Sequence, residues 1–168
     1  MRKIGLILLC LFALYVAYLY ITGKRITYLI PKGYEGVLLI IGNQKEGIEI
    51  NKSHAIYDFT KSNIIKLKGD LITGFSPWGY LNYYEVDEEG NKEKIETIND
   101  EVEYAADVKG DKIYIWSYYY EIGSCEVKSN GKTNYEVIVV GKKKNVETFA
   151  IEKQQLVNKE ICNKKAPK

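Results

Sequence analysis

The sequence predicts a mainly β protein in which a transmembrane helix comes first, antiparallel strands follow, and one α-helix comes last. Three observations predict this order. Residues 4–21 form an uncharged apolar run, and short segments rich in Tyr, Ile, Val and Thr follow it, separated by Gly and Asn. Near the C-terminus the apolar residues recur with a helical period. We therefore divide the chain into an anchor over residues 1–23 and a β-rich domain over residues 24–168.

The anchor is predicted from the length of the apolar run. As a helix at about 1.5 Å per residue, residues 4–21 would span roughly 27 Å, close to the hydrocarbon thickness of a bilayer, about 30 Å. A signal peptide cleaved near Ala17 and a helix buried in the core are the alternatives. A lipoprotein signal is disfavoured because leucines, and no small residue, precede Cys10.

The orientation of the anchor follows from its position in the chain. Basic residues on the two sides of the run nearly balance, so the positive-inside rule alone does not decide the orientation. A short tail before a long domain is the usual layout of a chain whose N-terminus stays in the cytoplasm. We therefore expect a single-pass protein of a bacterial cell membrane with an extracytoplasmic domain.

Apolar, β-branched and aromatic segments predict the strands of the domain. They lie at residues 27–30, 36–41, 48–50, 55–59, 64–66, 71–73, 80–86, 92–98, 103–108, 112–127 and 133–140. Turn residues predict hairpins among the later strands. Asn130 and Gly131 suit a type I′ turn. Residues 87–91 suit a turn followed by a Gly bulge, and residues 109–111 suit a similar turn.

The long segment 112–127 and the C-terminal helix carry the clearest patterns. In the strand, Gly123 is expected to mark a bulge, and alternation places one core stripe, made of Tyr114, Trp116, Tyr118, Tyr120 and Ile122. The helix is expected at about 145–162, with Asn145 as its N-cap and an end near Cys162. Its apolar face should dock against the sheet.

The opening of the domain resembles a known family. Residues 30–36, reading IPKGYEG, resemble the start of uncharacterised bacterial membrane-associated β domains, which open with I-P-x-G-Y-x-G. The likeness continues through residues 37–41, 55–59 and 83–91, and it covers residues 28–98. The resemblance implies a small antiparallel β-sandwich of transthyretin- or immunoglobulin-like type beside a signal or anchor. It departs from the family pattern at Phe59-Thr60, where the family has a proline, and no functional residue carries over.

Charge and residue types exclude several kinds of chemistry. The 24 basic and 22 acidic residues are interspersed, with a net charge of +2, which argues against nucleic acid binding. The single histidine, His54, cannot form a recognised zinc site with the distant cysteines. The acidic clusters at 87–89 and 100–103 lack the spacing of a helix-loop-helix calcium site. We therefore expect no catalytic residue, no metal and no cofactor.

Two pairs of residues are the candidate functional positions. Cys125 and Cys162 could form a disulfide in an oxidising compartment, or they could be free thiols packed as small apolar groups. Trp78 and Tyr80 lie in an aromatic loop that could stack on a sugar, a cell-envelope polymer or a partner protein. The alternative is that Trp78 plugs one end of the fold.

The leading interpretation is a membrane-tethered extracytoplasmic protein that acts as a binding or structural module without catalysis. One alternative is an immunity or accessory partner at the membrane. The other is an envelope-acting enzyme that uses carboxylates such as Asp58 or Glu85. The ligand, the partner and the oligomeric state do not follow from the sequence.

Overall fold

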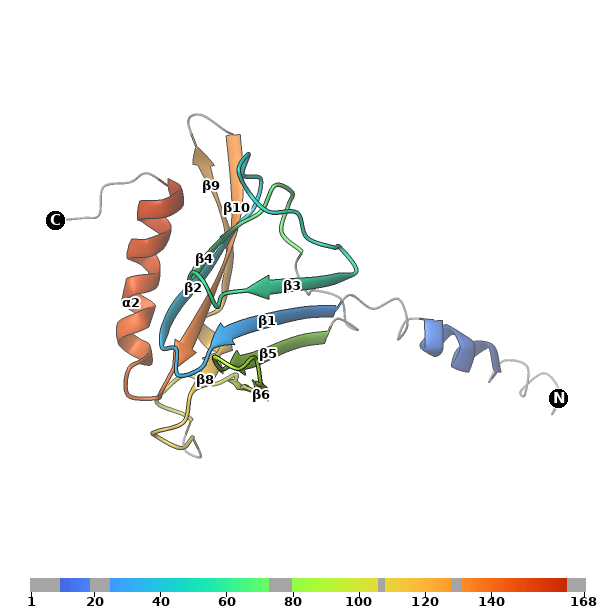
Figure 1. Ribbon diagram of the computed structural model, residues 1–168. Helices are drawn as coiled ribbons and strands as arrows, with labels where there is room; N and C mark the ends of the chain where they lie inside the picture. Colours follow the sequence, from blue (N-terminus) through green and yellow to red (C-terminus); the bar gives the residue numbers. More distant parts are fainter. Residues whose placement is uncertain (1–9, 19–24, 73–79, 106–107, 128–130, 163–168) are drawn as a thin grey trace.

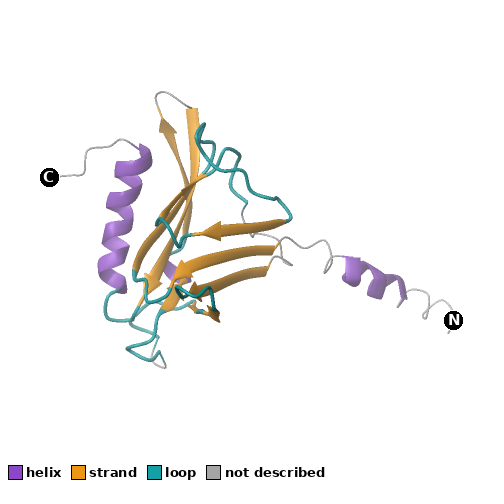
Figure 2. Cartoon of the chain, viewed as in Figure 1, coloured by secondary structure: helices purple, strands orange, loops and turns teal. Residues whose placement is uncertain are grey.

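The computed structural model describes residues 10–18, 25–72, 80–105, 108–127 and 131–162 (Figure 1). Figure 2 shows that strands dominate this part of the chain and that one long helix lies beside them. The mainly β class and the C-terminal helix are therefore confirmed. The elements are β1 (Arg25–Pro31), β2 (Gly36–Ile41), β3 (His54–Asp58), β4 (Ile64–Lys66), β5 (Tyr80–Val86), β6 (Lys92–Lys94), β7 (Glu96–Ile98), β8 (Tyr114–Trp116), β9 (Glu121–Val127), β10 (Gly131–Gly141) and α2 (Val146–Val157).

The strands form two sheets, and the chain alternates between them from β1 to β5. One sheet has the order β3-β1-β5-β6, and the other has the order β4-β2-β10-β8-β7, with β9 also paired to β10. Because each return to a sheet starts from the same end, β1 runs parallel to β3 and β5, and β2 runs parallel to β4. The expectation of a purely antiparallel fold is therefore wrong, and the transthyretin- or immunoglobulin-like type is not established.

The long strand β10 organises the second sheet. It runs antiparallel to β2, to β9 along its first half, and to β8 at its last two residues. From Tyr135 to Val140 its side chains, like those of β2, are buried on both faces. This double burial explains the continuous apolar runs of the two strands.

Three layers result from this arrangement. The first sheet packs on one face of the second through a core that contains Tyr28, Tyr57 and Ile138. On the other face, α2 covers Val137, Val139 and their neighbours (Figure 1). The second sheet is therefore the middle layer of the molecule.

Some predicted strands are absent or interrupted. Residues 101–105 form a turn, residues 71–72 are not in a strand, and residues 48–50 contribute only the bridge between Ile48 and Leu67. A 3-10 helix over Ser117–Tyr119 divides the predicted strand 112–127 into β8 and β9. The single core stripe expected there is wrong, because Tyr118 is 52% exposed after this break.

The predicted turns have different outcomes. Residues 87–91 do connect the antiparallel pair β5–β6, with Gly90 at φ 85°. The pair β9–β10 is antiparallel as expected, although residues 128–130 lie outside the described part of the chain. The hairpin at residues 109–111 is wrong, because the described residues 103–105 are not in a strand and β8 pairs in parallel with β7.

Gly123 has a packing role in place of the expected bulge. It pairs regularly with Tyr135 across β9 and β10. A Cβ atom at this position would overlap the Tyr135 ring. The glycine therefore lets the ring lie flat against the β9 backbone.

The helix begins as expected but without the predicted cap. Asn145 occupies the N-cap position, yet its side chain makes no capping hydrogen bond and donates instead to Glu35. After Val157 the helix continues as one π-helical turn over Asn158–Cys162. The predicted end near Cys162 is confirmed.

The predicted anchor lies largely outside the described residues. Residues 10–18 are helical, and apolar side chains such as Leu11 and Phe12 are exposed there. Residues 1–9 and 19–23 are not described. Within the described residues, no helix has the length and apolar character needed to cross a bilayer.

Candidate functional site

The residues predicted to stack on a ligand are not placed by the structure. Trp78 lies outside the described part of the chain, and Tyr80 opens β5 with a side chain that is likewise not described. The stacking hypothesis therefore stays a prediction.

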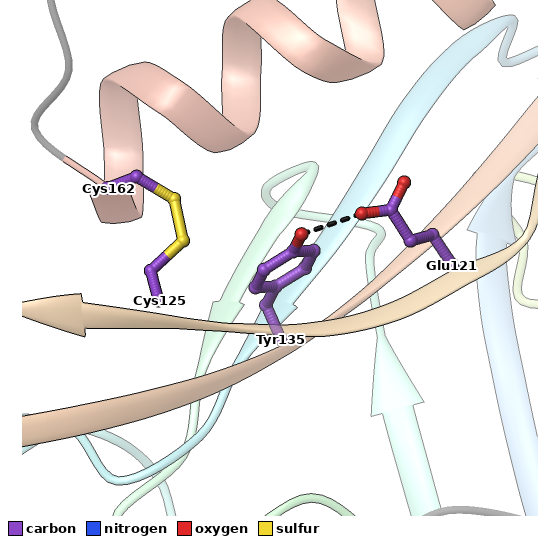
Figure 3. The surroundings of a disulfide bond; sticks show 4 residues. All are labelled: Glu121, Cys125, Tyr135 and Cys162. Atoms are coloured by element: carbon purple, nitrogen blue, oxygen red, sulfur yellow. Dashed lines mark hydrogen bonds between the residues drawn. A yellow bond between two sulfur atoms is a disulfide. The ribbon is translucent and has the colours of Figure 1, made fainter.

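The two predicted cysteines are joined in the structure. Cys125 in β9 and Cys162 at the end of the helix form a disulfide with a Cα–Cα distance of 5.5 Å (Figure 3). Beside it, the Tyr135 hydroxyl donates a 2.6 Å hydrogen bond to Glu121, which also pairs with Lys153 of α2 at 2.8 Å. These contacts attach the helix to the β9–β10 pair.

The carboxylates considered for catalysis lie apart. Asp58 pairs with Leu29 and Glu85 pairs with Ile30, so the two carboxylates project from opposite faces of the first sheet. Asp58 accepts hydrogen bonds from Thr60, mainly from its hydroxyl, and these lower the pKa of Asp58. Glu85 accepts a hydrogen bond from the Gly33 amide. Asp58 therefore stabilises a local turn, and Glu85 holds the turn between β1 and β2 from the neighbouring strand β5.

The remaining candidate groups are also dispersed. His54 is exposed at the start of β3. Asp87 holds the β5–β6 turn through Asn91. Within the described residues, no three His, Cys, Asp or Glu side chains gather as metal ligands.

The opening motif has a structural role. Gly33 adopts φ 78° in the turn between β1 and β2, and the Tyr34 hydroxyl donates to the Val37 carbonyl. Burial alone would raise the pKa of Glu35, but hydrogen bonds from Asn145 and Lys142 outweigh it and lower the pKa. The motif thus fastens the first turn to the loop before α2.

A pocket opens at one edge of the core between the sheets, and we call it the inter-sheet pocket. It has a volume of about 350 Å³ and a mainly apolar lining. Leu81 and Tyr83 of β5 line it from the first sheet, and the second sheet and the residues that follow β7 and β8 contribute Thr97, Asn99, Ile115, Ser117 and Tyr120. Volumes of this order are typical of small-molecule sites, in which a few polar groups accompany apolar walls.

The position of Leu81 shows why this space is open. Leu81 pairs with Ile26, and both side chains belong to the inner face of the first sheet. Ile26 is fully buried, but Leu81 remains 40% exposed. The inner face of β5 is therefore uncovered at this end.

Behind the pocket lies a cluster of one carboxyl and four tyrosines, which we call the Glu136 cluster. Glu136 of β10 is 0% exposed, and its Oε1 accepts a 2.6 Å hydrogen bond from the Tyr28 hydroxyl. Tyr28 stacks on Tyr83, with ring centroids 4.6 Å apart, and tilts against Tyr57 at 5.3 Å. Tyr120 also interacts with the carboxyl. Tyr83 and Tyr120 therefore belong to both the cluster and the pocket wall.

Burial controls the ionisation of this cluster. Loss of hydration raises the pKa of Glu136 to about 7, although Tyr28 and Tyr120 lower it in part. Burial, followed by the charge of Glu136, raises the pKa of Tyr57 to about 12 and those of Tyr83 and Tyr120 further. The tyrosines consequently stay neutral where Glu136 titrates.

Sequence reasoning did not find this cluster. In the sequence, Glu136 lies within an ordinary predicted strand, and tyrosines are common strand-forming residues. One signal was present, because Glu136 is the charged residue in the otherwise apolar stretch YEVIVV. A charge on the same face as Ile138 and Val140 has to be buried if that face is in the core.

A larger hollow elsewhere is a weaker candidate. It has a volume of about 470 Å³ and is lined by the loops around residues 48–52 and 67–72. Its charged residues, Glu49, Lys52 and Asp70, are all exposed. Water competes for such groups, and they offer little binding energy.

These features describe a helix-covered, two-sheet β protein with a small apolar pocket. The chain belongs to DUF6843, a family of unknown function whose model matches residues 22–149. The predicted membership in a family of unknown function is thus confirmed. The comparison does not test the I-P-x-G-Y-x-G motif itself.

Two further comparisons complete the description. No protein with a curated description matches the chain. Among solved structures, a candidate lipoprotein from Bacillus anthracis is similar, with 15% sequence identity and a TM-score of 0.48. The similarity covers 84% of this chain and 100% of that chain.

Proposed function

We propose that this chain is a membrane-tethered extracytoplasmic protein that binds a small, mainly apolar ligand in the inter-sheet pocket and does not transform it. The single observation that carries the binding function is the uncovered inner face of β5, where Leu81 and Tyr83 line an open space. Monomeric proteins usually bury the apolar inner face of a sheet, so an open apolar space there is a candidate ligand site.

The proposed location rests on two further observations. Residues 4–21 have the length and composition of a membrane span. The disulfide between Cys125 and Cys162 is of the kind that persists in oxidising compartments. An anchor with the domain outside the cytoplasm accounts for both.

The absence of catalysis is proposed from the pocket lining. Leu81, Ile115 and two neutral tyrosines offer contact area and hydrogen bonds but no activated nucleophile. Asp58 and Glu85 cannot act on one substrate together, because they lie on opposite faces of the sheet.

Binding can be tested on the full chain in lipid nanodiscs with methyl-labelled Leu and Ile. We expect 2-phenylethanol, a small apolar probe, to shift the NMR signals of Leu81 and Ile115 saturably. Leu81→Trp should fill the pocket and abolish the saturable shift of Ile115. Ile56→Trp is the matched control, because Ile56 is 54% exposed on the opposite face of the same sheet. Saturation that survives Leu81→Trp would refute the assignment of the pocket.

The location can be tested separately with protease. Cells stripped of their wall or outer layers should lose the domain to added protease while a cytoplasmic marker survives. Protection of the domain until the cells are lysed would contradict the extracytoplasmic location.

A further inference from the structure

We propose that the ligand of the inter-sheet pocket is an organic cation, an amine carried on an apolar body, and that buried Glu136 supplies the complementary negative charge from behind Tyr83 and Tyr120. This inference rests on the proposed binding function and specifies its ligand class. It depends on three features of the Glu136 cluster and the pocket wall.

The first feature is that the carboxyl has no partner of opposite charge. Among the described residues, no Lys or Arg forms an ion pair with Glu136. Its Oε2 atom is buried and has no hydrogen-bond partner of good geometry, although Tyr120 lies close enough to interact. Burying a carboxylate without a cation raises the free energy of the folded protein. Binding of a cation nearby offsets a large part of that free energy.

The second feature is the aromatic wall between the carboxyl and the pocket. Tyr83 and Tyr120 line the pocket and also interact electrostatically with Glu136. A cation within about 6 Å of a tyrosine ring centre is attracted by the negative face of the ring. Because Glu136 is fully buried, water screens its charge weakly, and the carboxylate behind the rings adds to this attraction.

The third feature is the distribution of polarity in the pocket. Leu81 and Ile115 form an apolar surface that would contact the body of the ligand, and Thr97 and Asn99 are exposed at the rim. A neutral ligand would gain the apolar contact and hydrogen bonds but no attraction to the charge, and an anion would be repelled when Glu136 is ionised. The pocket therefore discriminates by charge.

The attraction depends on pH through one group. Tyr28, Tyr57, Tyr83 and Tyr120 face Glu136 from β1, β3, β5 and the segment before β9, and all have pKa values raised above the ordinary value of 10. The pKa of Glu136 is raised to about 7. Between pH 5.5 and 8, the carboxyl changes charge and the tyrosines that face it do not.

The test compares three probes of similar shape on the full chain in zwitterionic nanodiscs: phenethylammonium, 2-phenylethanol and phenylacetate. An alkylamine stays protonated at both pH values, because it titrates near lysine, at about 10. Saturable methyl shifts of Leu81 and Ile115 give the affinity. At pH 8 we expect the cation to bind about tenfold more tightly than the alcohol, with phenylacetate weakest.

Two changes should remove the preference for the cation. At pH 5.5, and in Glu136→Gln at pH 8, the cation and the alcohol should bind within about threefold of each other. The pH comparison uses the wild-type chain. The test therefore remains decisive even if Glu136→Gln folds poorly.

The outcomes separate the two proposals. If the alcohol binds at Leu81 as tightly as the cation at pH 8, or if phenylacetate binds more tightly, the charge inference is wrong and the pocket remains an apolar site. If the cation preference persists unchanged in Glu136→Gln, its source is not Glu136. If none of the probes shifts Leu81 and Ile115, the proposed binding function itself is wrong.

Discussion

Glu136 and Gly123 show how single positions control this core. In β10, Glu136 places a carboxyl where alternation would otherwise bury another apolar side chain, and the Tyr28 hydroxyl satisfies only one of its oxygens. Gly123 has the opposite role, because the absence of a side chain makes room for the Tyr135 ring. One residue is costly because of its charge, and the other is required because of its size.

Glu136 should make the stability of the protein fall as the pH rises. Its pKa is about 7 in the folded state and near 4.5 in the unfolded chain, so below pH 4.5 both states hold the proton. Between pH 4.5 and 7 the unfolded state ionises first, and folding becomes less favourable. The loss should reach about 3 kcal/mol above pH 8.

Guanidinium unfolding of the full chain, followed by near-UV circular dichroism at several pH values, measures this dependence. Glu136→Gln should remove it and make the protein more stable than wild type at pH 8. A wild-type profile that stays level from pH 4.5 to 8 would contradict burial of the ionisable carboxyl.

Gly123→Ala should destabilise the protein by about 1–3 kcal/mol, because the new Cβ atom overlaps the Tyr135 ring. The same unfolding measurement tests this expectation. Tyr135→Leu in the same chain should recover part of the loss, because the ring is then absent. Gly110→Ala is the control, since a Cβ atom there meets no other atom.

At the scale of elements, the alternation of strands between the two sheets explains most of the architecture. After β1 and again after β3 the chain passes through a strand of the other sheet, so β1, β3 and β5 run parallel. The helix α2 then covers the free face of the second sheet, and the disulfide ties its far end to β9. The attachment of α2 is therefore partly covalent.

Loss of the disulfide should destabilise the protein by about 4 kcal/mol on the chain-entropy estimate, given a sequence separation of 37 residues. We expect Cys125→Ser with Cys162→Ser to lower the unfolding midpoint. Amide hydrogen exchange should become faster over residues 158–162 than over the start of α2. The matched control is Cys10→Ser, because Cys10 is a free cysteine. Equal midpoints for the two variants would show that the bond is absent or has no effect on stability.

At the scale of the whole molecule, a β domain with three layers follows an apolar N-terminal run. Residues 10–18 are helical with exposed apolar side chains, whereas most of the large apolar side chains described in the domain lie in its core. Exposure of this kind suits a lipid environment. The single-pass topology stays a prediction, and the cysteines provide a direct test of it.

Thiol labelling should report one reactive cysteine per chain. In the denatured, unreduced protein, a maleimide should modify Cys10 alone, and after reduction it should modify Cys10, Cys125 and Cys162. In untreated membranes Cys10 should react slowly, because hydrocarbon disfavours the thiolate. Rapid labelling of Cys10 by an impermeant maleimide in untreated membranes would contradict the bilayer location.

Local patterns were sufficient for much of the fold but not for its topology. Residue types and turn residues placed β2, β4 and β5, and the helical period placed the C-terminal helix, because these signals arise within a few residues of each other. Paired strands lie far apart in the chain. The residue pattern of a strand does not indicate which strand it pairs with or in which direction. The parallel pairs β1–β3 and β7–β8 were missed for that reason.

The candidate site was even less accessible from local signals. The linkage of Cys125 and Cys162 depended on a distance that spacing does not supply. Glu136 meets Tyr28 across 108 positions of sequence. The sequence by itself determined the β class, several of the strands, the terminal helix and the apolar N-terminal run, since each follows from the types and spacing of neighbouring residues. The tertiary structure alone decided the parallel pairings, the Glu136 cluster and the inter-sheet pocket, because burial, ionisation and open space depend on residues that only folding brings together.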